Sequence, residues 1–301
     1  MRNDIEFRTT DGTLLRGWHY VPEGPGPFPT VVMATGLSGV KEGGRLPDLA
    51  ERFAAAGLAA VVYDHRNLGT SEGTPRQEID PLLQMRDYSD AVTFAETLPQ
   101  TDLERIGAWG SSLSGGHVIV LAGQDRRVRA IVAQVPMVSG RECGQRLVPA
   151  PALAAAAAFH RADRRARMAG GTPAMIPVAS PDPTAPAALP TPDSWEFVQT
   201  HNDLPTYRNE VTLRSMELLT GYEPGLLIER VSPTPMLMIV AEDDLVCPPE
   251  LQFAAYSRAH EPKKYVSIRG GHFDVYRDAL AFDRAAEAAV AFFTEHLGAA
   301  G

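Results

Sequence analysis

Short apolar runs alternate along this chain with segments of helical periodicity, and this alternation limits the folds that the chain can adopt. The apolar runs cover Thr30–Thr35, Ala59–Tyr63, Ile106–Trp109, Ala130–Val135, Pro235–Ala241 and Tyr265–Ile268. The helical segments cover Leu46–Ala56, Pro81–Leu98, Leu113–Ala122, Pro249–His260 and Ala279–Leu297. Strands that are apolar on both sides are typical of a parallel sheet with helices on both faces. The sequence therefore predicts an α/β fold.

The N-terminal segment has a different pattern. Ile5–Thr10 and Leu14–Val21 flank the dipeptide Asp11-Gly12, which is a strong turn signal. We therefore expect a β-hairpin ahead of the parallel strands.

The alternation stops near Pro136 and resumes near Pro235. The intervening segment contains GGTPAMIPVASPDPTAPAALPTPDSW, where the prolines exclude regular helix and central strand. A further helical part is expected from Trp195 to about Leu219. We interpret residues 1–138 and 231–301 as one core domain and residues 139–230 as a helical, proline-rich lid insertion. The alternative is a disordered linker. Five aromatic residues argue for packed structure instead, because disordered segments contain few of them: Phe159, Trp195, Phe197, Tyr207 and Tyr222.

Composition excludes several classes of protein. The formal net charge of −9 argues against general nucleic-acid binding, which depends on clustered Lys and Arg. The basic run from Arg161 to Arg167 is interpreted as a solvated helix face. The two cysteines, Cys143 and Cys247, form neither a disulfide framework nor a zinc motif. The first residues lack the apolar core of a signal peptide, and no apolar stretch is long enough to span a bilayer. We expect a cytoplasmic protein without metal or organic cofactor.

A candidate nucleophile lies between a predicted strand and a predicted helix, in the sequence RIGAWGSSLSGGHVIV. A nucleophile at such a sharp turn needs small residues two positions before and after it. Ser112 meets this requirement, with Gly110 before it and Ser114 after it, where the usual G-x-S-x-G pattern has glycine. Ser114 is a rival nucleophile, although it would lie inside the first turn of the helix. A Gly/Ser turn without chemistry is also compatible with this segment alone.

A serine nucleophile needs a base and an acid, which should follow it in the order Ser, Asp, His near the ends of later strands. After the run PMLMIVA comes the acid loop EDDLVCP, and after YVSIRGG comes His272. Asp244 is the favoured acid because it precedes a short apolar pair and a proline, while Asp243 is the second candidate. We predict Ser112, Asp244 and His272 as the catalytic residues.

These segments carry a resemblance to the α/β-hydrolase superfamily over nearly the whole chain. The pieces ATGLSGVKEG, YDHRNLGTSEG, WGSSLSGGHV, YRNEVTLR, VAEDDLVCPP and GGHFDVY are similar to bacterial serine hydrolases near the dienelactone hydrolases and the X-Pro dipeptidyl-peptidase-like proteins. Some members of this group are associated with polyketide pathways. The resemblance implies an α/β-hydrolase fold, with a mostly parallel eight-stranded sheet, helices on both faces and a helical lid.

The resemblance also implies an oxyanion hole formed by the backbone N–H groups of Leu37 and Leu113. The family usually has His-Gly where this chain has Thr35-Gly36, so the bracing of this loop is expected to differ. Asp64 and Arg66 match a further family element. We interpret them as a buried pair that braces the oxyanion loop, although direct substrate contact would also explain them.

The predicted reaction is cleavage of an ester or thioester through an acyl-enzyme. Acyl transfer or C–C bond hydrolysis in polyketide or other natural-product metabolism would use the same residues. A peptidase, or a non-catalytic binding protein built on this fold, is less favoured, and the complete set of Ser, Asp and His argues against the binding protein. We expect a small-molecule acyl substrate, apolar or aromatic, and a monomer or homodimer. The candidate substrate-binding residues are Met137, Phe159, Met175, Ile176, Trp195, Phe197 and Tyr207.

Overall fold

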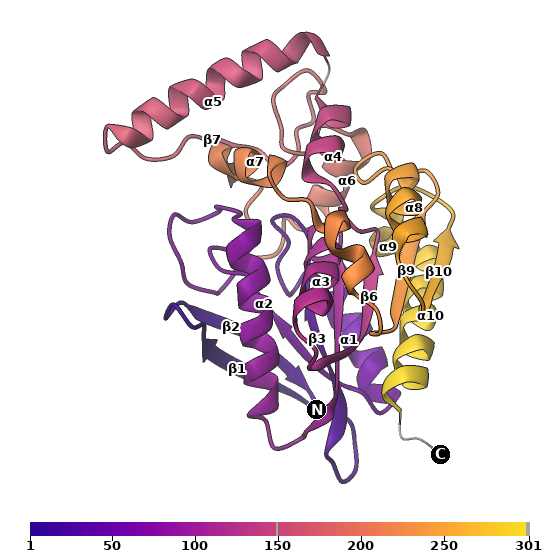
Figure 1. The fold of residues 1–301 in the computed structure, drawn as a ribbon. Helices are drawn as coiled ribbons and strands as arrows, with labels where there is room; N and C mark the ends of the chain where they lie inside the picture. The colour runs from indigo at the N-terminus through magenta and orange to yellow at the C-terminus, as the bar shows by residue number, and fades with distance from the viewer. Residues whose placement is uncertain (149, 299–301) are drawn as a thin grey trace.

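The fold is built around one twisted sheet of eight strands, seen in the computed structural model, which describes residues 1–148 and 150–298 (Figure 1). The strands lie in the order β1-β2-β4-β3-β5-β6-β9-β10. Their bounds are β1 Arg2–Arg8, β2 Leu14–Tyr20, β3 Phe28–Ala34, β4 Ala59–Tyr63, β5 Thr101–Ser111, β6 Val128–Gln134, β9 Met236–Ala241 and β10 Lys263–Ile268. The predicted apolar runs all become strands of this sheet.

The sheet is mostly parallel, with an antiparallel start. β1 pairs with β2 as a hairpin in which Arg8 opposes Leu14, and Gly12 in its turn has a φ of 90°, a conformation that favours glycine. β2 is also antiparallel to β4, and every pairing from β4 to β10 is parallel. The predicted hairpin and the predicted parallel sheet are both confirmed.

Helices cover both faces of the sheet. They are α1 Leu46–Ala55, α2 Pro81–Glu96, α3 Leu113–Gln124, α8 Pro249–Arg258, α9 Asp274–Arg277 and α10 Ala279–Leu297. Neighbouring strand residues divide between two cores because side chains alternate along a strand. Val32 packs in one core with residues of α2, α3 and α8, whereas Val31 packs in the other with residues of α1 and α10.

The segment predicted as an insertion lies over one end of the sheet (Figure 1). Its elements are α4 Gly140–Leu147, the 3₁₀ helix η1 Ala150–Ala152, α5 Leu153–Met168, β7 Met175–Ile176, α6 Pro192–Gln199, β8 Val211–Thr212, α7 Leu213–Thr220 and the 3₁₀ helix η2 Pro224–Arg230. β7 pairs with β8 as a small antiparallel sheet. Helix α5 is the outermost element, and among its described residues only Asp163 is buried.

One detail of this segment differs from the sequence expectation. The single helical part expected from Trp195 to about Leu219 is divided into α6, a loop that contains Pro205, and α7. This division is consistent with the inability of proline to sit inside a helix. The proline-dense stretch is packed, because Val178 and Ala188 are buried in a cluster with Leu113 of α3. η2 lies against α3, and its Ile228 is part of the sheet core.

Candidate active site

Ser112 occupies a strained turn between β5 and α3. Its φ of 57° and ψ of −117° lie in a region that residues other than glycine rarely adopt. The strain is held by the surrounding backbone: the amide of Ser112 donates to the Gln134 carbonyl at 2.9 Å, and its carbonyl accepts from the amide of Met137 at 2.9 Å. A Cβ atom on Gly110 would lie 2.0 Å from the carbonyl oxygen of Ser114, so a residue larger than glycine does not fit. The turn therefore projects the Ser112 side chain beyond the end of β5.

His272 and Asp244 meet this serine from two other strand ends. His272 Nε2 lies 3.0 Å from Ser112 Oγ, and His272 Nδ1 lies 2.7 Å from Asp244 Oδ2. Asp244 follows β9 and His272 follows β10, so the three residues come from loops at the same end of the sheet. His272 and Asp244 are both buried, with 2% of their surfaces exposed.

The Asp244 carboxylate fixes the orientation of the imidazole. Its Oδ1 accepts hydrogen bonds from the backbone amides of Val246 at 2.8 Å and Cys247 at 2.7 Å. Because an ionised carboxylate only accepts hydrogen bonds, Nδ1 of His272 carries the proton that faces Oδ2. In the neutral imidazole, Nε2 then presents a lone pair to the Ser112 hydroxyl. The second candidate acid, Asp243, is exposed and its amide donates to the Gly270 carbonyl.

The loop after β3 lies beside Ser112. A Cβ atom on Gly36 would lie 2.7 Å from the Cβ of Ser112, so this glycine allows the loop to approach the serine closely. The backbone amides of Leu37 and Leu113 donate no hydrogen bond to another group in residues 1–148 and 150–298. Leu113 directly follows Ser112 in the chain, and Leu37 follows Gly36 and lines the cavity at Ser112.

A cavity opens at Ser112 and His272, and the inserted segment contributes to its wall. Its lining is mostly apolar and aromatic on the side of this segment, where it comprises Val178, Leu189, Ser194, Phe197, Val198, His201 and Tyr207. On the side of the core it includes Leu37, Trp109, Phe273 and Tyr276. Phe197 stacks on Phe273 with ring centroids 4.6 Å apart, which joins α6 to the loop of His272.

Two of the seven predicted substrate-binding residues, Phe197 and Tyr207, line this cavity. Met137, Ile176 and Trp195 are half-buried and pack against the cluster that includes Leu113. Phe159 and Met175 are exposed on α5 and β7, with 62% and 41% of their surfaces accessible. Burial raises the pKa of Tyr207 to about 12, so its phenol is neutral at neutral pH.

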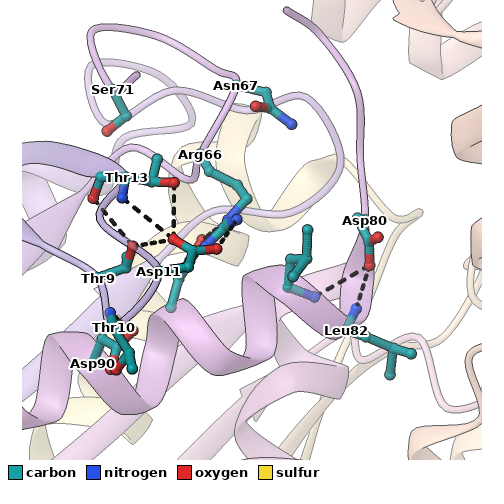
Figure 2. Close-up of polar contacts among 12 residues, drawn as sticks. Thr9, Thr10, Asp11, Thr13, Arg66, Asn67, Ser71, Asp80, Leu82 and Asp90 are labelled. Atoms are coloured by element: carbon teal, nitrogen blue, oxygen red, sulfur yellow. Dashed lines mark hydrogen bonds and ion pairs between the residues drawn. The ribbon is translucent and has the colours of Figure 1, made fainter. Parts of the chain in front are cut away.

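Asp64 and Arg66 are both buried, and each pairs with a different partner. Asp64 accepts from the backbone amide of Lys41 at 2.7 Å and from its ammonium at 2.8 Å, which ties the loop after β3 to the loop after β4. Arg66 instead binds Asp87 of α2 at 2.7 Å. It also binds Asp11 of the hairpin at 2.8 Å (Figure 2). The two residues therefore do not form a pair with one another, because their side chains serve separate ion pairs.

Ser114, the rival nucleophile, is fully buried, and its hydrogen-bond partners do not include His272. Its hydroxyl contacts the Thr35 carbonyl and His65 Nε2. Sequence reasoning missed His65, His201 and Tyr276, which the fold places at or beside the cavity. Tyr276 hydrogen-bonds Ser111, the neighbour of Ser112. Of these three residues, only Tyr276 could have been placed near the site from the sequence, because it lies four residues after His272.

Residues 1–148 and 150–298 hold no group of three His, Cys, Asp or Glu side chains placed to bind a metal ion. Over the same residues, the apolar length of every helix falls short of what crossing a bilayer requires.

Comparison with known proteins agrees with this architecture. The model of the X-Pro dipeptidyl-peptidase (S15) family matches residues 11–274. The chain is 34% identical over 284 residues to a thiohydrolase of Eupenicillium brefeldianum, covering 92% of this chain and 89% of that protein. It is 30% identical over 274 residues to the polyketide transferase grgF of a Penicillium species, covering 91% and 90%.

A solved structure extends the likeness to three dimensions. The structure of the DcsB complex with its substrate analogue superposes with a TM-score of 0.87 at 31% identity, covering 99% of both chains. The chain belongs to the X-Pro dipeptidyl-peptidase (S15) family and is an enzyme, a hydrolase of the α/β-hydrolase fold.

Proposed function

We propose that this enzyme cleaves an ester or thioester through an acyl-enzyme formed on Ser112, with His272 as the base and Asp244 as the acid that orients it. The observation that carries the proposal is the 3.0 Å distance between Ser112 Oγ and His272 Nε2. A serine is a weak nucleophile unless an adjacent base accepts its proton as it attacks. The unprotonated Nε2 of His272 supplies that base.

The first half of the reaction forms the acyl-enzyme. Ser112 Oγ attacks the substrate carbonyl carbon while its proton passes to His272 Nε2. The imidazolium is stabilised by the Asp244 carboxylate, which remains ionised. The carbonyl oxygen becomes an oxyanion and accepts hydrogen bonds from the amides of Leu37 and Leu113. The tetrahedral intermediate then expels the alcohol or thiol, which takes the proton from His272.

The second half releases the acyl group. Water enters, His272 takes one of its protons, and the hydroxide attacks the acyl carbon. Ser112 leaves as an alcohol when His272 returns the proton, and a carboxylic acid is the product. The free amides of Leu37 and Leu113 stabilise both oxyanions, and each donor is worth about 2.7–4 kcal/mol in such sites.

The cavity lining supports an apolar or aromatic acyl group. Phe197, Leu189 and Val178 present apolar surface beside Ser112, and we propose that residues 139–230 act as a lid whose inner wall selects the substrate. The likeness to a thiohydrolase favours a thioester over an oxygen ester. A small-molecule acyl substrate fits a cavity of this kind.

Acyl transfer is the second candidate. The chain is similar to a protein named polyketide transferase, and an acyl-enzyme can pass its acyl group to an alcohol or amine in place of water. The two reactions share every step up to the acyl-enzyme. They differ only in which nucleophile reaches the acyl carbon.

One experiment tests the proposal and separates the two candidates. The purified chain is assayed with p-nitrophenyl esters and acyl thioesters of graded length, with and without an added alcohol, and products are identified by mass spectrometry. We expect faster turnover of medium or long acyl groups than of short ones. In Ser112→Ala and His272→Ala, turnover should fall by several orders of magnitude. Free acid as the main product in the presence of the alcohol supports hydrolysis, and the new ester supports transfer. Full activity in Ser112→Ala would refute the proposal.

A further inference from the structure

Two positions at which this chain departs from its family pattern contact one another. The usual pattern has histidine at position 35 and glycine at position 114, and this chain has Thr35 and Ser114. The hydroxyl of Ser114 donates a hydrogen bond to the main-chain carbonyl of Thr35. A glycine has no side chain that could make this bond, so the contact depends on the departure at position 114. Ser114 is fully buried in the first turn of α3, next to Ser112 and Leu113.

The direction of the hydrogen bonds around Ser114 can be deduced from its two partners. A carbonyl oxygen only accepts, so the single hydroxyl proton of Ser114 points at Thr35. His65 Nε2 lies 2.8 Å from the same hydroxyl oxygen and must therefore donate to it. His65 is 1% exposed, and burial lowers its pKa to about 4, so its ring is neutral and carries one proton. Its Nδ1 is buried and has no partner among the described residues. The order of donation is thus from His65 to Ser114 to the Thr35 carbonyl.

The loop that follows β3 is held at two points, Thr35 and Lys41, by consecutive residues of another loop. At its start, Thr35 is bound through Ser114 to His65. Further along the loop, the amide of Lys41 donates to Asp64 at 2.7 Å. Asp64 and His65 are adjacent and buried in the loop after β4. Leu37 lies between the two attachment points, so its amide direction depends on both.

The position of an oxyanion-hole amide matters because the stabilisation requires a donor that is already oriented before the charge develops. The peptide unit is planar, so holding the Thr35 carbonyl fixes the plane that ends at the Gly36 Cα. Only the dihedral angles of Gly36 then separate this plane from the peptide that carries the Leu37 amide. A Cβ atom on Gly36 would lie 2.7 Å from Ser112, so Gly36 itself has little room to move.

We propose that Ser114 and His65 are positioning residues that orient the Leu37 amide toward the oxyanion by fixing the Thr35 carbonyl. This inference rests on the proposed function, since it assigns a task to these residues in that same reaction. Neither residue belongs to the lining of the cavity at Ser112.

The central test removes the hydroxyl with Ser114→Ala and measures kcat and KM separately on an activated ester. We expect kcat to fall by about 10- to 100-fold with KM changed by less than about threefold, since transition-state stabilisation is lost without loss of ground-state binding. Thr30→Val is the matched control. It removes another fully buried hydroxyl from the opposite end of β3, far from the loop, and should lower the melting temperature without lowering kcat.

A double-mutant cycle tests whether His65 acts through Ser114. His65→Leu should lower kcat in the wild-type background and have little further effect in Ser114→Ala, while His65→Gln, which retains an N–H donor, should recover part of the loss. The inference is overturned if Ser114→Ala keeps wild-type kcat, or if the two losses are fully additive. The rate of labelling by a fluorophosphonate distinguishes a failure of this inference from a failure of the proposed function. A wild-type chain that is not labelled contradicts the proposed function, whereas equal labelling rates in wild type and Ser114→Ala contradict only this inference.

Discussion

Asp243 and Asp244 are adjacent residues of the same type with opposite surroundings. Asp244 is buried against two backbone amides and His272, and Asp243 is exposed to solvent. At the level of single residues, Asp244 is placed to orient the imidazole of His272, whereas Asp243 faces solvent. The sequence allowed either aspartate to be the acid, and substitution of each one separately can distinguish between them.

We predict that Asp244→Asn lowers kcat by about four orders of magnitude. The asparagine amide can donate to Nδ1, and the imidazole then carries its proton on Nε2, where it cannot accept one from Ser112. Asp243→Asn is the matched control and should retain kcat within about threefold. Steady-state kinetics on the same ester give both values. Equal losses in the two variants would contradict the assignment of Asp244.

At the scale of the element, one buried arginine joins three parts of the fold. Arg66 in the loop after β4 binds Asp87 on α2. It also binds Asp11 in the turn of the β1–β2 hairpin (Figure 2). Asp87 is fully buried, whereas Asp11 is half exposed. Without Arg66, the buried Asp87 carboxylate would have no positive partner among the described residues. Asp11 would instead be hydrated, because it is half exposed.

We predict that Arg66→Met lowers the free energy of unfolding by about 3–5 kcal/mol, the typical cost of leaving one charge of a buried pair without its partner. Asp11→Asn removes the exposed partner of the same arginine and should cost about 0–1 kcal/mol. Urea denaturation followed by circular dichroism measures both. A loss below about 1 kcal/mol in Arg66→Met would show that this arginine does not connect the elements.

The sequence predicted elements better than it predicted contacts between them. The strands could be recognised because each is a short apolar run, and Ser112, Asp244 and His272 could be grouped because parallel strands place their carboxyl ends at one edge of the sheet. No local pattern indicates that Arg66 pairs with Asp87 rather than with Asp64. The contact between His65 and Ser114, and the place of His201 in the cavity wall, likewise arise only when separate loops meet.

At the scale of the whole molecule, buried histidines link stability to pH. Burial lowers the pKa of His19 to about 4 and that of His65 to about 4, and it lowers the pKa of His117 well below the usual value of 6.5. The unfolded chain therefore binds more protons than the folded chain between about pH 4 and pH 6.5. Stability rises with pH across this window, and the histidine contribution is lost as pH falls through it.

We predict that the free energy of unfolding decreases between pH 7 and pH 5, and that His19→Gln reduces this decrease by about 1–2 kcal/mol. Glutamine cannot take up a proton, so the variant removes one of the linked groups. His19 lies in β2, away from Ser112, which keeps the measurement independent of catalysis. Urea denaturation at the two pH values gives the slopes, and identical slopes in wild type and variant would contradict the linkage.

The role of Ser112 as the nucleophile is tested by finding which atom of the enzyme reacts with an electrophile. The wild-type chain is treated with a fluorophosphonate, digested, and mapped by mass spectrometry, with His272→Ala as the comparison. We predict a single adduct on Ser112 in the wild type, and labelling that is several orders of magnitude slower in His272→Ala. An adduct on Ser114 or another residue, or labelling of Ser112 at the same rate without His272, would contradict this role.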